Sequence, residues 1–215
     1  MTEKKKERPI IFSGEMIKAI LEGKKTQTRR VIKPQPGGHR DGCWPVDSNS
    51  PLAEFCFWHD LIEEKPDEQI FCPYGKPGDR LWVREAWADM VCVSSTERGK
   101  GKGESNPHYK ASADSTELKI LKSAWKPSIH MPKWASRITL EIKNVRVEKV
   151  QKIPVYDAYW EGAPACDIHG HDDCFYGIHG HQCSFERLWD SINAKRGYGW
   201  DKNPWVWVIE FKRSD

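Results

Sequence analysis

Residues 22–30, EGKKTQTRR, mark the passage from a helix to a strand, and the first two elements of the fold follow from them. Upstream, apolar residues recur at helical spacing and Ser13 is a good N-cap, so we expect a helix over 13–22. Gly23 is the type of residue that ends a helix in the left-handed conformation. The following TRRVI is predicted to be extended. Lys25 and Thr28 therefore need a bend between them, because residues three apart in a straight strand face opposite ways.

The same segment carries reactive and cationic groups. It crowds four cations and two threonine hydroxyls into nine residues, which suits phosphate, a nucleobase or acyl chemistry. Threonine becomes a nucleophile when a neighbouring base takes its proton, and a lysine whose pKa is lowered can be that base. Burial, or the charges of Lys24, Arg29 and Arg30, would lower the pKa of Lys25 in this way. The alternative is an exposed basic turn.

The pattern G-x-K-x-x-T-x-R, formed here by Gly23, Lys25, Thr28 and Arg30, resembles the signature of the ASCH domain family, whose fold is a PUA-like β-barrel. GDRLWVREAW over 78–87 resembles the family's strand after a Gly-Asp turn, and NPWVWVIEFKR over 203–213 resembles its closing strand. WKPSIHMPKWASRITLEI over 125–142 is similar to the longer, phage or prophage branch of the family.

The resemblance implies an α+β fold: a small PUA-like, partly open β-barrel with helices packed at its ends and long loop insertions. We expect a single ASCH domain over 1–215, with insertions near 34–77, 88–124 and 164–183. The segment up to residue 77 is predicted to be irregular with one short element around 55–62, and 100–106 to be a flexible loop.

Periodicity predicts the remaining elements. Strands are expected over 80–87, 138–142 and 205–212, and a short helix near 155–161. A break at Lys143 and Asn144 separates the strand over 138–142 from the alternation that resumes at Val145. Ser184 is predicted to cap a last helix, with one apolar face formed by Phe185, Leu188, Trp189 and Ile192.

One branch of the ASCH family hydrolyses N4-acylated cytidines with a lysine, a threonine and a glutamate. The resemblance implies that Lys25 is the base, Thr28 the nucleophile and Glu161 the acid. A glutamate in an apolar pocket can hold a raised pKa and give its proton to the leaving amine. The alternative for Glu161 is a surface carboxylate before a helix-ending Gly162.

Further residues are candidates for binding the substrate or a nucleic acid. Arg84 and Glu85 interrupt an apolar strand, where an Arg can bind phosphate or carbonyl oxygen; the alternative is a structural ion pair. KPSIHMPKWASR offers donors, an imidazole and a stacking surface. The complete set is Lys24, Arg29, Arg30, Arg84, Glu85, Ser128, His130, Trp134 and Arg137.

Residues 166–183, CDIHGHDDCFYGIHGHQC, concentrate thiols and imidazoles at short spacings that suit zinc. The candidate ligands are Cys166, His169, His171, Cys174, His179, His181 and Cys183. We expect structural zinc here, with an unmetallated loop as the alternative. A catalytic zinc of the base-deaminase type is disfavoured because the H-x-E and P-C-x-x-C signature is missing from the sequence. The Lys and Thr mechanism itself requires no cofactor.

Composition restricts the partner. A net charge of +3 and a pI near 8.4 permit nucleic-acid contact without demanding it, and eleven tryptophans leave some for stacking on bases. No apolar run has membrane length, so we expect a cytoplasmic protein without a membrane partner. The expected partner is a modified nucleoside or single-stranded RNA or DNA. A non-catalytic RNA or modified-DNA binding module and a ribonuclease are the alternatives to an amidohydrolase.

Overall fold

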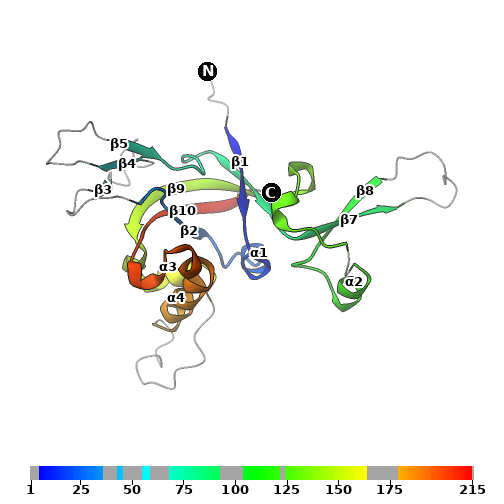
Figure 1. The fold of residues 1–215 in the computed structure, drawn as a ribbon. Helices are drawn as coiled ribbons and strands as arrows, with labels where there is room; N and C mark the ends of the chain where they lie inside the picture. Colours follow the sequence, from blue (N-terminus) through cyan, green and yellow to red (C-terminus); the bar gives the residue numbers. More distant parts are fainter. Residues whose placement is uncertain are drawn as a thin grey trace.

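The computed structural model describes residues 5–35, 43–45, 55–58, 68–92, 104–121, 124–163 and 179–214. Its main unit is a five-stranded sheet with the strand order β1-β6-β9-β10-β2 (Figure 1). β1 pairs with β6 in parallel, and the other neighbours are antiparallel. These strands are β1 (Glu7–Ile11), β2 (Gln27–Val31), β6 (Arg80–Arg84), β9 (Thr139–Lys149) and β10 (Trp205–Ser214). The fold is α+β, as predicted, and the sheet is open, with β1 and β2 at its edges.

Helices cover parts of this sheet. α1 follows β1 directly, and α3 and α4 lie together below β9 and β10 in Figure 1. The α-helices are α1 (Gly14–Leu21), α2 (Ser115–Ile120), α3 (Val155–Trp160) and α4 (His179–Asn193). Single 3-10 turns occur at η1 (Ser128–His130), η2 (Lys133–Ala135), η3 (Val150–Lys152), η5 (Ala194–Arg196) and η6 (Trp200–Lys202). No helix in the described ranges is long and apolar enough to cross a membrane.

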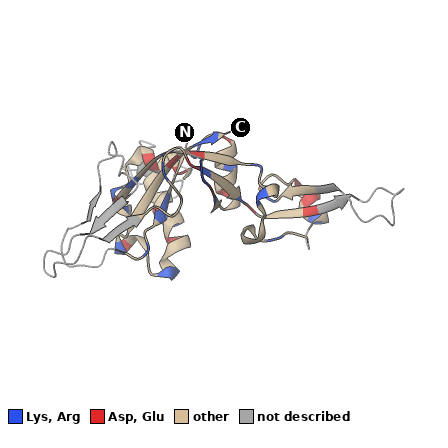
Figure 2. Cartoon of the chain, turned by 90° about the horizontal axis from the view of Figure 1, so that it is seen from above, with Lys and Arg blue, Asp and Glu red and all other residues tan. Residues whose placement is uncertain are grey.

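Two smaller sheets project from opposite sides of the main sheet in Figure 1. One contains β3 (Cys43–Pro45), β4 (Phe55–Trp58) and β5 (Glu68–Phe71), so the segment predicted to be irregular holds three strands. The other pairs β7 (Trp87–Cys92) with β8 (Glu104–Tyr109). The loop expected over 100–106 therefore ends in a strand from residue 104. Cationic and acidic residues are interspersed along the described elements (Figure 2).

β9 is one continuous strand, whereas its sequence predicted a break at Lys143 and Asn144. Ile142 pairs with Phe211 and Asn144 with Glu210, so Lys143 is an extra residue in a β-bulge. The bulge shifts the alternation by one position, which returns Val145 to the same buried side as Ile142. The change of phase in the sequence thus marks a bulge within a strand.

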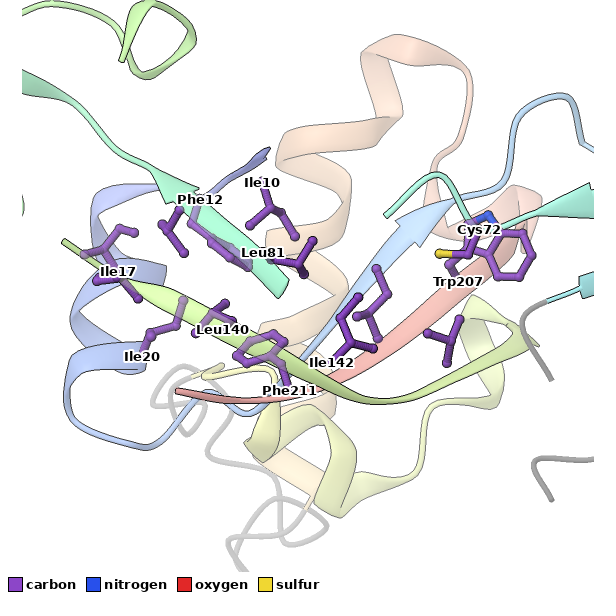
Figure 3. Packing of buried hydrophobic residues seen from close by; sticks show 14 of the residues in the cluster. Ile10, Phe12, Ile17, Ile20, Cys72, Leu81, Leu140, Ile142, Trp207 and Phe211 are labelled. Carbon is purple, nitrogen blue, oxygen red and sulfur yellow. The ribbon is translucent and has the colours of Figure 1, made fainter. Parts of the chain in front are cut away.

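β10 is buried on both faces, which explains its uninterrupted apolar run. Trp207, Ile209 and Phe211 belong to a large core with α1, β6 and β9, shown in Figure 3. Val206 and Val208 belong to a second core with α3 and α4. Strands covered on both faces lose the alternation of apolar and polar residues.

The helix boundaries follow the local sequence in part. Ser13 caps α1, since its hydroxyl accepts from the Met16 main-chain nitrogen, and Gly23 ends the helix at φ 72°. α4 begins at His179, so the prediction that Ser184 caps it is wrong. Ser184 lies inside the helix, five residues after its first residue. Phe185 and Trp189 on the predicted apolar face are buried.

Candidate active site

The basic segment leads from α1 into the edge strand β2. Thr28 pairs with Ile209, Arg29 with Val208 and Arg30 with Trp207. Because directly paired residues share a face, Thr28 and Arg30 lie on the side of the large core and Arg29 on the side of α3 and α4. Lys25 precedes the strand, in the bend that the sequence required. Residue alternation in β2 therefore sends its two arginines to different surroundings.

Lys25 and Glu161 form a buried ion pair. Lys25 Nζ donates to Glu161 Oε2 and to the Glu161 main-chain oxygen, both at 2.7 Å, and the two side chains are 0% and 3% exposed. Burial lowers the pKa of Lys25, and the nearby charge of Glu161 only partly opposes this effect. The structure thus brings together two members of the predicted catalytic set that are 136 residues apart.

The position of Glu161 depends on a glycine. Glu161 ends α3, and Gly162 continues the chain at φ 77°. A Cβ atom at residue 162 would lie 2.9 Å from the Ala19 Cβ and 3.3 Å from the Lys25 Cβ. Only glycine fits this backbone conformation and this close approach of α3 to α1. The end of α3 is thereby held against Lys25.

Arg29 ties the same carboxylate to its neighbours. Its Nη1 donates to Glu161 Oε1 at 3.0 Å, its Nη2 to Asp157 Oδ2 at 2.8 Å, and its Nε to Glu148 Oε1 at 2.7 Å. Burial opposes the charge of Arg29, but Glu161 and Glu148 outweigh this effect and raise the pKa of the guanidinium. Arg146 adds ion pairs to Asp157 and Glu148. The guanidinium of Arg29 is therefore engaged by three carboxylates of the protein.

A cavity of about 350 Å³ lies along the open edge of β2. Thr28, Arg30 and Glu161 line it, so the threonine and the glutamate of the predicted set face a common space. The remaining walls are largely aromatic or apolar and come from β5 and the segment after it, from α4, from the turn after η5 and from β10. They include Tyr74, Phe185, Leu188, Trp189, Ile192, Tyr198 and Trp207.

Arg30 differs from Arg29 in its partners. Its Nη2 donates to the Ile11 main-chain oxygen at 2.6 Å, and its guanidinium carbon lies 5.2 Å from the centre of the Phe12 ring. Among the described residues, its Nε has no hydrogen-bond partner, and Arg30 takes part in no ion pair. Burial lowers the pKa of this guanidinium, but arginine stays protonated in proteins. Arg30 thus brings a positive charge to the cavity that no described carboxylate pairs with.

The second group of predicted ligand residues lies elsewhere. Arg137 donates to Glu85 through two nitrogens, each at 2.9 Å, and Glu85 is 2% exposed. Trp134 is 59% exposed and packs edge-on against Trp87. Within the part of the chain that the structure describes, the cavity is lined by none of Lys24, Arg84, Glu85, Ser128, His130, Trp134 and Arg137. Lys24 forms a surface ion pair with Glu22.

The predicted zinc ligands fall partly outside the described residues. Cys166, His169, His171 and Cys174 lie there, as does the side chain of His179. His181 Nδ1 lies 2.7 Å from the Ala163 main-chain oxygen, and its ring packs edge-on against Tyr159. Among the described side chains, no group of three or more His, Cys, Asp and Glu residues has metal-binding geometry.

Sequence reasoning missed several residues of the site. Tyr74 and Tyr198 line the cavity from turns without a periodic signal, and only the fold shows that these turns adjoin β2. Asp157 and Glu148 read as ordinary polar positions on a helix and a strand. Their one available signal was the surplus of cations in residues 22–30, which required carboxylates from other elements if it was to be buried.

Comparison of the chain with known proteins found no relative. The chain matches no protein-family model, and neither curated proteins nor solved structures include a significant match.

Proposed function

We propose that this protein is an ASCH-type domain with a PUA-like fold that recognises a nucleoside or nucleobase and hydrolyses N4-acylated cytidine-like substrates. The buried Lys25 and Glu161 pair beside a cavity that Thr28 lines is the observation that carries the proposal. The cavity volume, about 350 Å³, lies within the usual range for small-molecule sites. Its aromatic walls suit a planar base.

The chemistry needs one proton shared within the pair. Burial lowers the pKa of Lys25, which favours the neutral amine that a base needs. In the proposed cycle, Lys25 first passes its proton to Glu161 within their hydrogen bond. Thr28 Oγ1 attacks the acyl carbonyl and passes its proton to Lys25, and Glu161 protonates the leaving exocyclic amine. An acyl ester on Thr28 and free cytidine result. Water then loses a proton to Glu161 as it attacks the ester, and Lys25 returns its proton to Thr28.

Arg30 is assigned to the oxyanion. Negative charge develops on the acyl oxygen during both attacks, and a fixed donor stabilises it most where water is excluded. The guanidinium of Arg30 has a nitrogen without a described partner and lies at the same cavity as Thr28. Arg29 has a different assignment: by holding Glu161 Oε1 and two further carboxylates, it positions the acid.

The test is turnover of N4-acetylcytidine, followed as cytidine by chromatography. Thr28→Val retains the branched shape of the side chain and removes the nucleophile, so turnover should fall at least about 10³-fold. Thr139→Val in β9 is the matched control and should retain turnover. Lys25→Met should lower turnover by about 10²–10⁴-fold, the usual effect of losing an acid or base. Parent-like turnover by Thr28→Val refutes the mechanism.

Loss of turnover in every protein, the parent included, would favour the non-catalytic reader. Binding of the nucleoside should then weaken in Arg30→Gln and change little in Thr28→Val, because a reader uses the cation and needs no nucleophile. Isothermal calorimetry with the same two variants distinguishes these cases. A ribonuclease would instead cleave an unmodified RNA strand in the same assay series.

Structural zinc remains a separate part of the proposal. The seven thiols and imidazoles over 166–183 exceed the four ligands that a structural zinc needs, and thiolates are preferred zinc ligands, so Cys166 and Cys174 are assigned to the ion. Metal analysis of the purified protein should find one zinc per chain, lost in Cys166→Ser/Cys174→Ser. Full zinc content in that variant would refute the assignment.

A further inference from the structure

A second cavity, of about 460 Å³, adjoins the candidate active site. It lies beside the start of β1 and the turn over 72–79. Four cationic residues line it, Lys5, Lys6, Arg8 and Lys76, together with the single carboxylate of Asp79. Phe71 lines both this basic cavity and the candidate active site, and its side chain is 59% exposed. The two cavities therefore meet at an exposed aromatic ring.

Hydrogen bonds to Asp79 hold the wall of the basic cavity in place. Asp79 accepts hydrogen bonds from the Lys6 main-chain nitrogen at 3.0 Å, from the Lys76 main-chain nitrogen at 3.3 Å and from Arg8 Nη1 at 3.1 Å. Gly75, at φ 118°, packs against this arrangement, because a Cβ atom there would lie 2.4 Å from Arg8 Nη1. One buried carboxylate thus fixes two separate segments of chain so that their cations surround one space.

Lys5 and Lys6 keep their charges accessible in this cavity. Lys5 is 52% exposed on its side chain and has a long contact of 3.7 Å to Glu141. Lys6 is exposed, and only its main chain bonds to Asp79. Exposed ion pairs at such distances are weak and are displaced readily by a stronger anionic ligand. The cavity therefore presents more positive charge than its own carboxylate neutralises.

We propose that the basic cavity binds the phosphodiester backbone of a single-stranded nucleic acid whose modified base occupies the candidate active site. The inference rests on the proposed recognition of a nucleoside and names a polynucleotide as the substrate class. Cations hold backbone phosphates, and an exposed ring such as Phe71 offers a surface on which a neighbouring base stacks. An acidic peptide would use the cations, but it has no use for the aromatic cavity beside them.

Fluorescence anisotropy with the full chain tests this site. The probes are labelled 12-nucleotide single strands of RNA and of DNA with one central N4-acetylcytidine. Lys5→Gln/Lys6→Gln removes two phosphate contacts, and each contact contributes about 0.7 to the salt slope of a single strand. We expect the slope to fall by about 1.4 and the affinity by about 25-fold at 0.1 M salt.

Lys110→Gln/Lys119→Gln is the matched control, because it removes two exposed lysines from the part of the chain that holds β8 and α2. This variant should bind as the parent does. Equal losses in both double variants would overturn the proposal, since they would indicate unspecific attraction by net charge. A double-stranded form of the same probe should bind more weakly, and binding as tight as that of the single strand would also overturn the proposal. The proposal would fail as well if polyglutamate of matched charge displaced the labelled strand as well as an unlabelled strand does.

The two probes identify the source of the backbone. If the RNA strand binds more tightly than the DNA strand, the protein also contacts the 2′-hydroxyl. If the two strands bind equally, it contacts the phosphates alone. Both results support the site. Binding does not require turnover. Oligonucleotide binding that depends on Lys5 and Lys6 without hydrolysis keeps this proposal and refutes the catalytic one. Turnover of the free nucleoside without oligonucleotide binding does the reverse.

Discussion

Replacing Glu161 by glutamine removes one negative charge from the buried site and hardly changes the size of the side chain. Glu161 lies 2.7 Å from Lys25 Nζ and 3.0 Å from Arg29 Nη1, and both cationic side chains are 0% exposed. Arg29 keeps its ion pairs with Glu148 and Asp157 in the variant. Lys25 keeps the main-chain oxygen of residue 161 and can bond to the amide oxygen of glutamine, but it loses the negative charge that compensates its own.

The loss of stability in Glu161→Gln follows from the unpaired charge of Lys25. Removing one partner of a buried ion pair typically lowers the free energy of unfolding by about 3–5 kcal/mol. We expect the lower part of this range at neutral pH, because Lys25 can escape the penalty by losing its proton. Each unit by which its pKa falls corresponds to about 1.4 kcal/mol. Turnover should also fall, by about 10²–10⁴-fold, because the proposed acid is lost.

The stability that Glu161→Gln loses relative to the parent depends on pH. Burial already lowers the pKa of Lys25 from its ordinary 10.5, and loss of Glu161 lowers it further. Between the folded and unfolded pKa values, the unfolded chain binds the proton and the folded chain does not, so stability rises with pH. The deficit of Glu161→Gln relative to the parent should therefore be largest at neutral pH and shrink as the pH rises towards 10.5.

Urea denaturation at several pH values measures this deficit. Lys25→Met/Glu161→Gln should be more stable than Glu161→Gln alone at neutral pH, because it removes the uncompensated cation as well. Glu141→Gln, at a partly exposed carboxylate of β9, is the matched control and should lose far less stability. A loss as small as that of the control, or a deficit that grows with pH, would show that Glu161 does not compensate a buried charge on Lys25.

Two further pairs of variants, one of substitutions and one of deletions, test the scaffold by chemical denaturation. The free energy of unfolding should fall by at least about 1 kcal/mol more in Gly162→Ala than in Gly197→Ala. Both glycines have positive φ, but only at residue 162 would the added Cβ lie 2.9 Å from the Ala19 Cβ. Equal losses would contradict the close approach of α3 to α1. Deletion of Lys143 should cost less stability than deletion of Glu141. Both remove the Lys143–Glu141 ion pair, and the second also removes the weak contact of Glu141 to Lys5, but only the second turns the buried Ile142 outward. The reverse order would contradict the bulge.

Local sequence signals predicted the elements whose causes are local. The cap at Ser13, the stop at Gly23 and the extended run after it come from residues within a few positions of each other. The doubly apolar run of β10 was likewise visible as a buried strand. The start of α4 was misplaced because a serine that can cap a helix is equally tolerated inside one.

Long-range features were harder to predict. Nothing local indicates that β1 pairs with β6 in parallel or that a turn near Tyr74 adjoins β2. The pairing of Lys25 with Glu161 was expected only from the resemblance, and its geometry depends on Gly162 bringing α3 against α1. The zinc assignment concerns residues that are mostly outside the described ranges, so it stays a prediction.

The most direct measurement is the search for an acyl group on Thr28 during turnover of N4-acetylcytidine. Rapid acid quenching, proteolysis and mass spectrometry would locate the ester, with Thr28→Val as the control. We predict an acetyl ester on Thr28 in the parent protein and free cytidine in equal amount in the first turnover. Substrate that stays intact, or cytidine released with the acetyl group on another residue, would contradict it.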